Sequence, residues 1–151
     1  MGLIVQKYGG TSVADIEKIR NVARRAARVR EAGNQVVVVL SAMAGETDRL
    51  IRLAQSACPD PPGREFDALI ATGEQVTVTL LSMILNEMNH PAKSFLGFQV
   101  RIRTDSAHAK ARILEVETAE IAKALRDGII CVVAGFQGVD ERGDITTLGR
   151  G

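Results

Sequence analysis

The stretch Val36–Leu40 reads VVVVL, five consecutive branched or aliphatic residues with no polar interruption. A strand of this composition is buried on both faces, which is typical of a parallel sheet covered by helices. The small-residue loop Ser41–Gly45 follows it, and a second apolar run, Ile129–Ala134, occurs near the end of the chain. We therefore expect an α/β domain built around these two strands.

Shorter patterns complete this prediction. A helix is expected from near Ala14 to Gly33, with Ser12 as its cap and Asp15 three residues later. The Gly135–Gly138 stretch is interpreted as a turn. The remaining expected elements are helices over about 47–57, 65–88 and 117–126, and strands over 3–6, 93–98 and 145–148. Because strands and helices alternate, the sheet should be mainly parallel and lie between helix layers.

Composition excludes several classes of protein. The 151 residues, 46% of them hydrophobic, suit one globular domain. Lys and Arg number 19 against 18 Asp and Glu, and aromatic residues make up only 3%, so we expect no nucleic-acid partner. No apolar run approaches the ~20 residues of a membrane span, and the N-terminus does not resemble a signal peptide. A cytoplasmic location without membrane association is therefore expected.

Metal binding is not expected from the sequence. The two cysteines, Cys58 and Cys131, form no CxxC pair, and His90 and His108 lack partners at ligand spacing.

The first strand ends in a group of residues suited to phosphate binding. Gly9 and Gly10 lack a Cβ, so their backbone can approach phosphate oxygens, and Lys7 adds a positive charge. The helix expected near Ala14 would point its positive end to the same place. A simple tight turn remains the alternative. Neither GxxxxGK[ST] nor GxGxxG is present.

Gly73 and Glu74 are unusual within a long apolar helix. Gly73 costs about 1 kcal/mol relative to alanine there, and an unpaired charge at Glu74 is costly. One interpretation pairs Glu74 with an arginine. The other lets Gly73 admit a ligand whose ammonium group Glu74 receives.

Six blocks in order, spread over essentially the whole chain, resemble the aspartate kinases of the amino acid kinase family. The blocks are VQKYGGTS (Val5–Ser12), VLSAM (Val39–Met43), ATGEQ (Ala71–Gln75), TDSAH (Thr104–His108), VAGFQG (Val133–Gly138) and TLGRG (Thr147–Gly151).

The resemblance implies a fold, a reaction and a site. The fold would be a three-layer αβα sandwich, and the reaction would convert L-aspartate and MgATP into 4-phospho-L-aspartate, the first step toward lysine, threonine and methionine. Mg²⁺ would be held by the nucleotide. The implied nucleotide-binding residues are Lys7, Tyr8, Gly9, Gly10 and Ser41; the implied aspartate-binding residues are Ser41, Thr47, Glu74 and Arg150; and Lys7 and Arg150 would be catalytic. Arginine suits this task because its planar fork matches a carboxylate.

The family pattern continues beyond the last residue of this chain. Its Gly-Arg-Gly is followed by Gly-Ser-Asp, then by a nucleotide-binding lobe and regulatory ACT domains, so residues 1–151 would be the N-terminal, amino-acid-binding part of the catalytic domain. The glycine-rich ending Thr147–Gly151 is itself typical of a truncated chain. We therefore expect little kinase activity from this chain alone. An unpaired sheet edge would favour a homo-oligomer or other self-association.

Three other interpretations remain open. Acetylglutamate, glutamate and uridylate kinases share the layout and an early glycine loop, although Ser41–Met43 and Thr72–Gln75 favour aspartate. The chain could instead be a non-catalytic amino-acid-binding or assembly module. A nucleic-acid-binding role has only the arginines of the first helix to support it.

Overall fold

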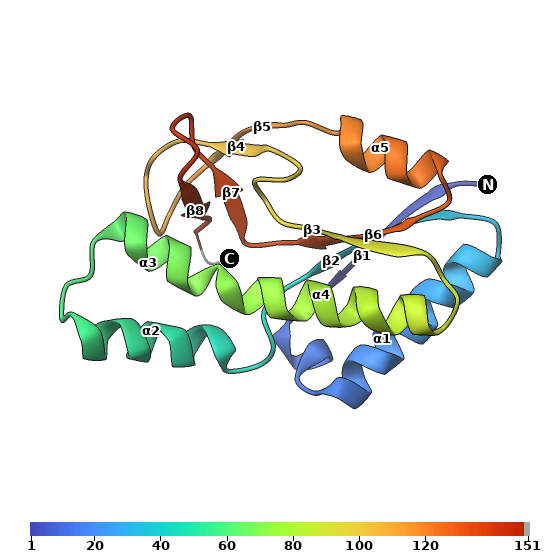
Figure 1. Ribbon diagram of the computed structural model, residues 1–151, viewed down its shortest axis with the longest axis horizontal. Coiled ribbons are helices and arrows are strands. Elements are labelled where there is room, and N and C mark those ends of the chain that lie inside the picture. The colour runs from blue at the N-terminus through green and yellow to red at the C-terminus, as the bar shows by residue number, and fades with distance from the viewer. Residues whose placement is uncertain (150–151) are drawn as a thin grey trace.

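The computed structural model describes residues 1–149 and contains two four-stranded sheets with helices around them (Figure 1). The strands are β1 (Leu3–Tyr8), β2 (Gln35–Leu40), β3 (Ala92–Phe95), β4 (Ile102–Thr104), β5 (Ile113–Val116), β6 (Ile130–Ala134), β7 (Gln137–Val139) and β8 (Ile145–Thr147). The helices are a 3₁₀ turn (Gly10–Val13), α1 (Ile16–Glu31), α2 (Glu46–Ala57), α3 (Gly63–Ile70), α4 (Thr72–Glu87) and α5 (Ala119–Arg126).

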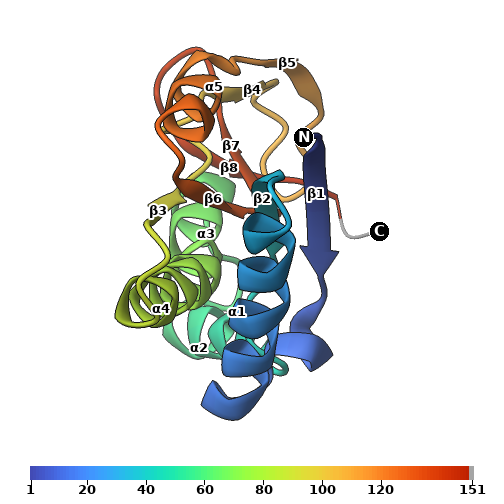
Figure 2. The ribbon, with the colours of Figure 1, turned by 90° about the vertical axis from the view of Figure 1, so that its right-hand side faces the viewer.

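The first sheet is entirely parallel and has the strand order β1-β2-β6-β3. Helices α1 and α4 pack on one face, where their apolar side chains meet Val36, Val38 and Leu40. Helix α5 covers the other face above Val37 and Cys131 (Figure 2). This arrangement confirms the expected α/β fold with three layers, and β2 and β6 lie next to each other at its centre.

Strand β1 forms one edge of this sheet. Figure 2 shows it at the border, with β2 as its neighbour. Leu3 and Val5 are 55% and 61% exposed, since the helices cover β2 and β6 instead. The outer edge of β1 therefore has no strand partner among residues 1–149.

The second sheet was not expected from the sequence. Its order is β5-β4-β7-β8, with β4 and β5 antiparallel and β7 and β8 forming a hairpin. The interpretation of Gly135–Gly138 as only a turn was wrong, because Gln137 and Gly138 already belong to β7. The strand expected over 145–148 is present as β8, and a hairpin loop connects it to β7.

The long helix expected over 65–88 is divided at Ala71, which lies between α3 and α4. The side-chain Nε2 of Gln137 donates a hydrogen bond to the Ala71 carbonyl at 3.1 Å, and the helical hydrogen bond from Gln75 N–H to that carbonyl lengthens to 3.4 Å. A side chain that enters the hydrogen-bond ladder in this way is a recognised cause of a helix break.

The start of α1 also differs from the expectation. Asp15, not Ser12, is the N-cap, and its Oδ1 accepts a hydrogen bond from the Lys18 N–H at 2.8 Å. A separate 3₁₀ turn therefore follows Gly9, and the N-terminal end of α1 is capped by its own carboxylate. The 3₁₀ turn therefore lies between Gly9 and the N-terminal end of α1, and the Asp15 carboxylate offsets part of the positive charge of that end.

The segment Gly63–Glu87 is long and apolar enough to cross a membrane by length and composition, contrary to the expectation that no stretch approaches this length. Polar residues such as Thr77 interrupt this segment, so no single apolar run in it reaches that length. Within the fold it behaves as a core helix: 56% of the window is buried, and Val78, Leu81 and Leu85 contribute to the hydrophobic core. This feature is weak evidence for a membrane span.

Candidate functional site

A cavity of about 570 Å³ opens where β1, β2 and β6 end. Ligand sites in open parallel sheets lie at the carboxyl ends of the strands, and this cavity has that position. Its lining comes from the end of β1, the loop after β2, the first turns of α2 and α4, and the segments after β6 and β8. The charged and polar members are Lys7, Ser41, Thr47, Asp48 and Glu74.

Five of the residues singled out from the sequence lie around this one cavity: Lys7, Gly10, Ser41, Thr47 and Glu74. Tyr8 and Gly9 do not line it. The Tyr8 side chain faces a smaller hollow beside α1, and its hydroxyl donates a hydrogen bond to Gln6 Oε1 at 3.2 Å. Arg150 lies outside the described residues. The roles predicted for Tyr8, Gly9 and Arg150 therefore stay predictions.

The Lys7 side chain provides the positive charge of the cavity. Lys7 pairs in register with Val39 in β2, so the two side chains lie on the same face of the sheet, and both line the cavity. Lys7 is exposed and forms no ion pair with residues 1–149. A Cβ added at the neighbouring Gly9 would meet no atom within 4 Å, so this residue faces open space.

The N-terminal end of α2 faces the same cavity. Gly45, its N-cap, has a φ of 77°, a conformation that favours glycine, and it turns the chain from the loop after β2 into the helix. Thr47 and Asp48 of the first turn line the cavity. The partial positive charge of a helix N-terminus therefore adds to that of Lys7.

Glu74 carries the buried carboxylate of the cavity and is only 2% exposed. Its Oε2 accepts hydrogen bonds from the Phe136 N–H and from Gln137 Nε2, both at 3.1 Å. No arginine within residues 1–149 pairs with it, so the interpretation as a structural Arg–Glu pair is wrong for the described part of the chain. Burial raises the pKa of Glu74 from 4.5 to about 7, and the two hydrogen bonds offset part of that rise.

Gly73 brings α4 close to α2 and to the loop after β2. A Cβ at this position would lie 3.1 Å from Ala42 Cβ, 3.3 Å from Leu50 Cδ1 and 3.4 Å from Glu46 Cγ. The absence of a side chain thus serves helix packing, and through this packing it places Glu74 at the cavity.

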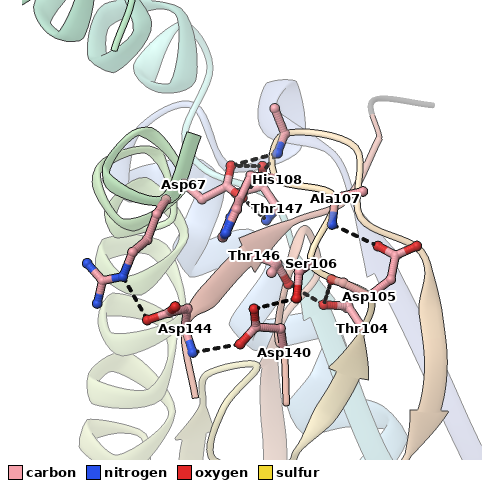
Figure 3. Close-up of polar contacts among 12 residues, drawn as sticks. Asp67, Thr104, Asp105, Ser106, Ala107, His108, Asp140, Asp144, Thr146 and Thr147 are labelled. Carbon is pink, nitrogen blue, oxygen red and sulfur yellow. Dashed lines mark hydrogen bonds and ion pairs between the residues drawn. The ribbon is translucent and has the colours of Figure 1, made fainter. Parts of the chain in front are cut away.

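A buried carboxylate anchors the edge of the cavity that follows β8 (Figure 3). Asp67 of α3 is fully buried, and its oxygens accept hydrogen bonds from the Thr147 N–H at 3.0 Å and the Thr147 hydroxyl at 2.6 Å. The Ala109 N–H and His108 Nδ1 contact the same carboxylate at 3.0 and 2.8 Å. Asp67 therefore ties α3 to the residues that immediately precede Leu148 and Gly149, which line the cavity.

A second carboxylate fixes the hairpin of the second sheet (Figure 3). Asp140 Oδ2 accepts a hydrogen bond from the Ser106 hydroxyl at 2.8 Å, and its Oδ1 accepts one from the Asp144 N–H at 3.0 Å. Arg64 of α3 in turn forms an ion pair with Asp144 at 2.7 Å. These contacts hold the β7–β8 hairpin against α3, so the last residues of β8 are held in a fixed position.

Sequence reasoning missed Asp48, Asp67 and Gln137. Asp48 directly follows the predicted Thr47 at a helix start, which is a signal that could have identified it. Asp67 and Gln137 gave no comparable signal, because their partners lie 40 or more residues away. Within residues 1–149, no group of three or more His, Cys, Asp or Glu side chains could hold a metal ion.

Comparison with known proteins gives a consistent result. The model of the amino acid kinase family matches residues 2–151. An aspartate kinase of Pseudomonas fluorescens is 58% identical in an alignment that covers all of this chain and 37% of the relative. The chain thus spans little more than a third of that relative's length.

Two solved structures have the same fold. The aspartate kinase from Synechocystis is 45% identical and superposes with a TM-score of 0.79 over 99% of this chain and 24% of its own. E. coli aspartokinase III in complex with aspartate and ADP is 25% identical and superposes with a TM-score of 0.86 over 99% of this chain and 44% of its own.

Proposed function

The chain belongs to the amino acid kinase family, and from this premise we propose that it forms the aspartate-binding part of an aspartate kinase. The observation that carries the proposal is the placement of Lys7 and Glu74 around one cavity at the ends of parallel strands. The names of the similar proteins support the choice of aspartate over other acceptors.

The cavity suits a small zwitterion that carries an additional carboxylate. The buried Glu74 would accept hydrogen bonds from the substrate ammonium group, and burial strengthens this interaction because water competes less. Thr47 and Ser41 would donate hydrogen bonds to the substrate carboxylates. Arg150 would be their cationic partner, as the family resemblance implies. N-acetylation of the substrate would remove the group that Glu74 recognises.

The opposite side of the cavity would hold the phosphates of ATP. Lys7, the backbone near Gly10 and the N-terminal end of α2 offer positive charge and N–H groups to the transferring phosphoryl group. In the reaction, an oxygen of the aspartate side chain forms a bond to the γ-phosphorus, and the bond from that phosphorus to ADP breaks. No general base is required, because the attacking carboxylate is already ionised at neutral pH. Mg²⁺ would arrive bound to the nucleotide and would offset the negative charge of its phosphates.

We further propose that the 151-residue chain has little kinase activity by itself, because positioning of both substrates supplies most of the rate and the chain spans only 37% of the relative's length. Incubation with aspartate, MgATP and hydroxylamine should yield no aspartyl hydroxamate above background. Robust hydroxamate formation would contradict this. A cytoplasmic location and a role in lysine, threonine and methionine synthesis belong to the same proposal, as does self-association through the edge of β1.

Titration calorimetry with a panel of acceptors tests the proposed substrate. L-aspartate should bind the purified chain, while L-glutamate, N-acetyl-L-glutamate and uridylate should bind about tenfold more weakly or not at all, since one misplaced polar or charged group costs at least ~1.4 kcal/mol. Preference for another acceptor would contradict the aspartate assignment. A non-catalytic module predicts no binding, or aspartate binding that Glu74→Ala leaves unchanged.

A further inference from the structure

Gln137 is a buried amide whose three hydrogen bonds join two separate parts of the fold. It is 2% exposed. Its Nε2 donates to Glu74 Oε2 and to the Ala71 carbonyl, both at 3.1 Å, and its Oε1 accepts from the Gly97 N–H at 3.3 Å. One side chain of β7 therefore connects the start of α4 with the segment after β3.

The orientation of this amide is fixed by its partners. The side-chain nitrogen faces two oxygens, those of Ala71 and Glu74, while its oxygen faces an N–H group. A flipped amide would oppose oxygen to oxygen at two contacts and N–H to N–H at the third, so only one arrangement satisfies all groups. Gln137 thus donates a hydrogen bond to Glu74 in the folded state and cannot accept one from it.

The backbone that carries Gln137 is tightly held. A Cβ at Gly97 would lie 2.6 Å from the Gln137 carbonyl oxygen, and a Cβ at Gly138 would lie 2.5 Å from the Ile102 carbonyl oxygen. Neither glycine could carry a side chain without movement of backbone. A rigid support of this kind keeps a donor at a constant distance from its acceptor.

We propose that Gln137 is a positioning residue of the cavity, whose amide favours the ionised form of the Glu74 carboxylate and orients it for a substrate ammonium group. The inference rests on the proposed aspartate site and adds a residue that does not touch the substrate. Hydrogen bonds to the ionised form of an acid favour that form, and Gln137 supplies one of the two that Glu74 accepts. Because burial opposes ionisation of Glu74, the loss of either donor should leave the carboxyl group protonated at neutral pH.

The charged groups around Glu74 come from two elements. Lys7 of β1 and Asp48 of α2 line the same cavity, and Glu46 of α2 packs next to Gly73. All three remain in every variant described next, so they contribute equally to each pH profile.

The test compares Gln137→Met with the wild-type chain across pH 5.5–8.5. Met has a similar length but no donor, so Glu74 should titrate at a pH at least about one unit higher, as followed by ¹³C NMR of glutamate side chains. Aspartate affinity at pH 7 should fall about fivefold or more, in step with the ionised fraction of Glu74, and recover toward pH 8.5, where Glu74 is again mostly ionised. Gln55→Met, which changes an exposed glutamine of α2 outside the cavity, is the matched control and should change neither profile.

A merely structural role for Gln137 predicts something else. Affinity would then fall by the same factor at every pH, and the titration midpoint of Glu74 would not move; that result overturns the inference. If Gln137→Met does not fold, as judged by circular dichroism, Gln137→Glu provides the same test, since two adjacent carboxyls cannot both ionise readily and the midpoint should again rise. The NMR titration needs no ligand, so failure of wild-type aspartate binding would contradict the proposed function without deciding the role of Gln137.

Discussion

Replacement of Asp67 with alanine is expected to lower the free energy of unfolding by about 3–5 kcal/mol, the range typical of a disrupted buried hydrogen-bond network. The substitution would leave the N–H groups of Ala109 and Thr147 without their acceptor. Each unsatisfied buried donor costs about 1–3 kcal/mol. The cavity left by the lost carboxylate adds to this cost.

Urea denaturation at pH 7 measures this effect directly. Asp60→Ala is the control, because Asp60 is exposed in the proline-containing loop between α2 and α3, and it should change stability by less than about 0.5 kcal/mol. A loss below about 1 kcal/mol for Asp67→Ala would mean that water or rearranged side chains replace the carboxylate. The anchoring of Thr147 by Asp67 would then be wrong.

Replacement of Glu74 with glutamine is expected to stabilise the chain at pH 8 while weakening its binding of aspartate. In the folded chain the pKa of Glu74 is about 7, against an ordinary value of 4.5. Because the folded-state pKa is raised, the free energy of unfolding is greatest below about pH 4.5. The contribution of Glu74 then declines as the pH rises and reaches its lowest value above about pH 7. The difference corresponds to about 3 kcal/mol at about 1.4 kcal/mol per pH unit.

The measurement is the free energy of unfolding of the wild-type chain minus that of Glu74→Gln, from pH 5 to pH 8. The variant lacks this titrating group, so its free energy of unfolding should rise relative to that of the wild type by up to about 3 kcal/mol as the pH rises. Glu141→Gln, which changes an exposed carboxylate, should give a difference near zero throughout. A difference between wild type and Glu74→Gln that does not vary with pH would show that Glu74 is not held in an environment that opposes ionisation.

The stability lost when Glu74 ionises and its proposed role in aspartate binding have a common physical basis. A buried carboxylate with only two donors is poorly compensated by the protein alone, and an ammonium group brought by a ligand would supply the missing charge. Sites that bind charged ligands are often less stable without them for this reason. Aspartate should therefore stabilise the wild-type chain more at pH 8 than at pH 5.5.

The parallel sheet could be predicted because its central strands have a clear local sequence pattern. The apolar runs in β2 and β6 allow burial on both faces and little else. The second sheet could not be predicted in the same way: β5 is exposed along its whole length, and β4 has only three residues. Short strands with mixed burial depend on partners distant in sequence, so a local pattern carries little information about them.

The candidate site shows the same division. Lys7 lies at the end of a recognisable strand and Gly10 follows that strand, so their position could be inferred from the sequence. The surroundings of Glu74 could not, because Phe136 and Gln137 lie more than 60 residues further along the chain. The contact of the Gln137 amide with the Ala71 carbonyl, at the junction of α3 and α4, likewise joins residues distant in sequence.

The most direct test of the central claim is to compare the affinities of L-aspartate and succinate for the wild-type chain and for Glu74→Gln by titration calorimetry at pH 8. Succinate keeps both carboxylates and lacks only the ammonium group. The wild-type chain should prefer aspartate by about 10–100-fold, the range expected for a hydrogen bond between charged groups, and Glu74→Gln should bind the two ligands within about threefold of each other. Equal affinity for both ligands in the wild-type chain, or an aspartate preference that survives in Glu74→Gln, would contradict the claim that Glu74 receives the ammonium group of the substrate.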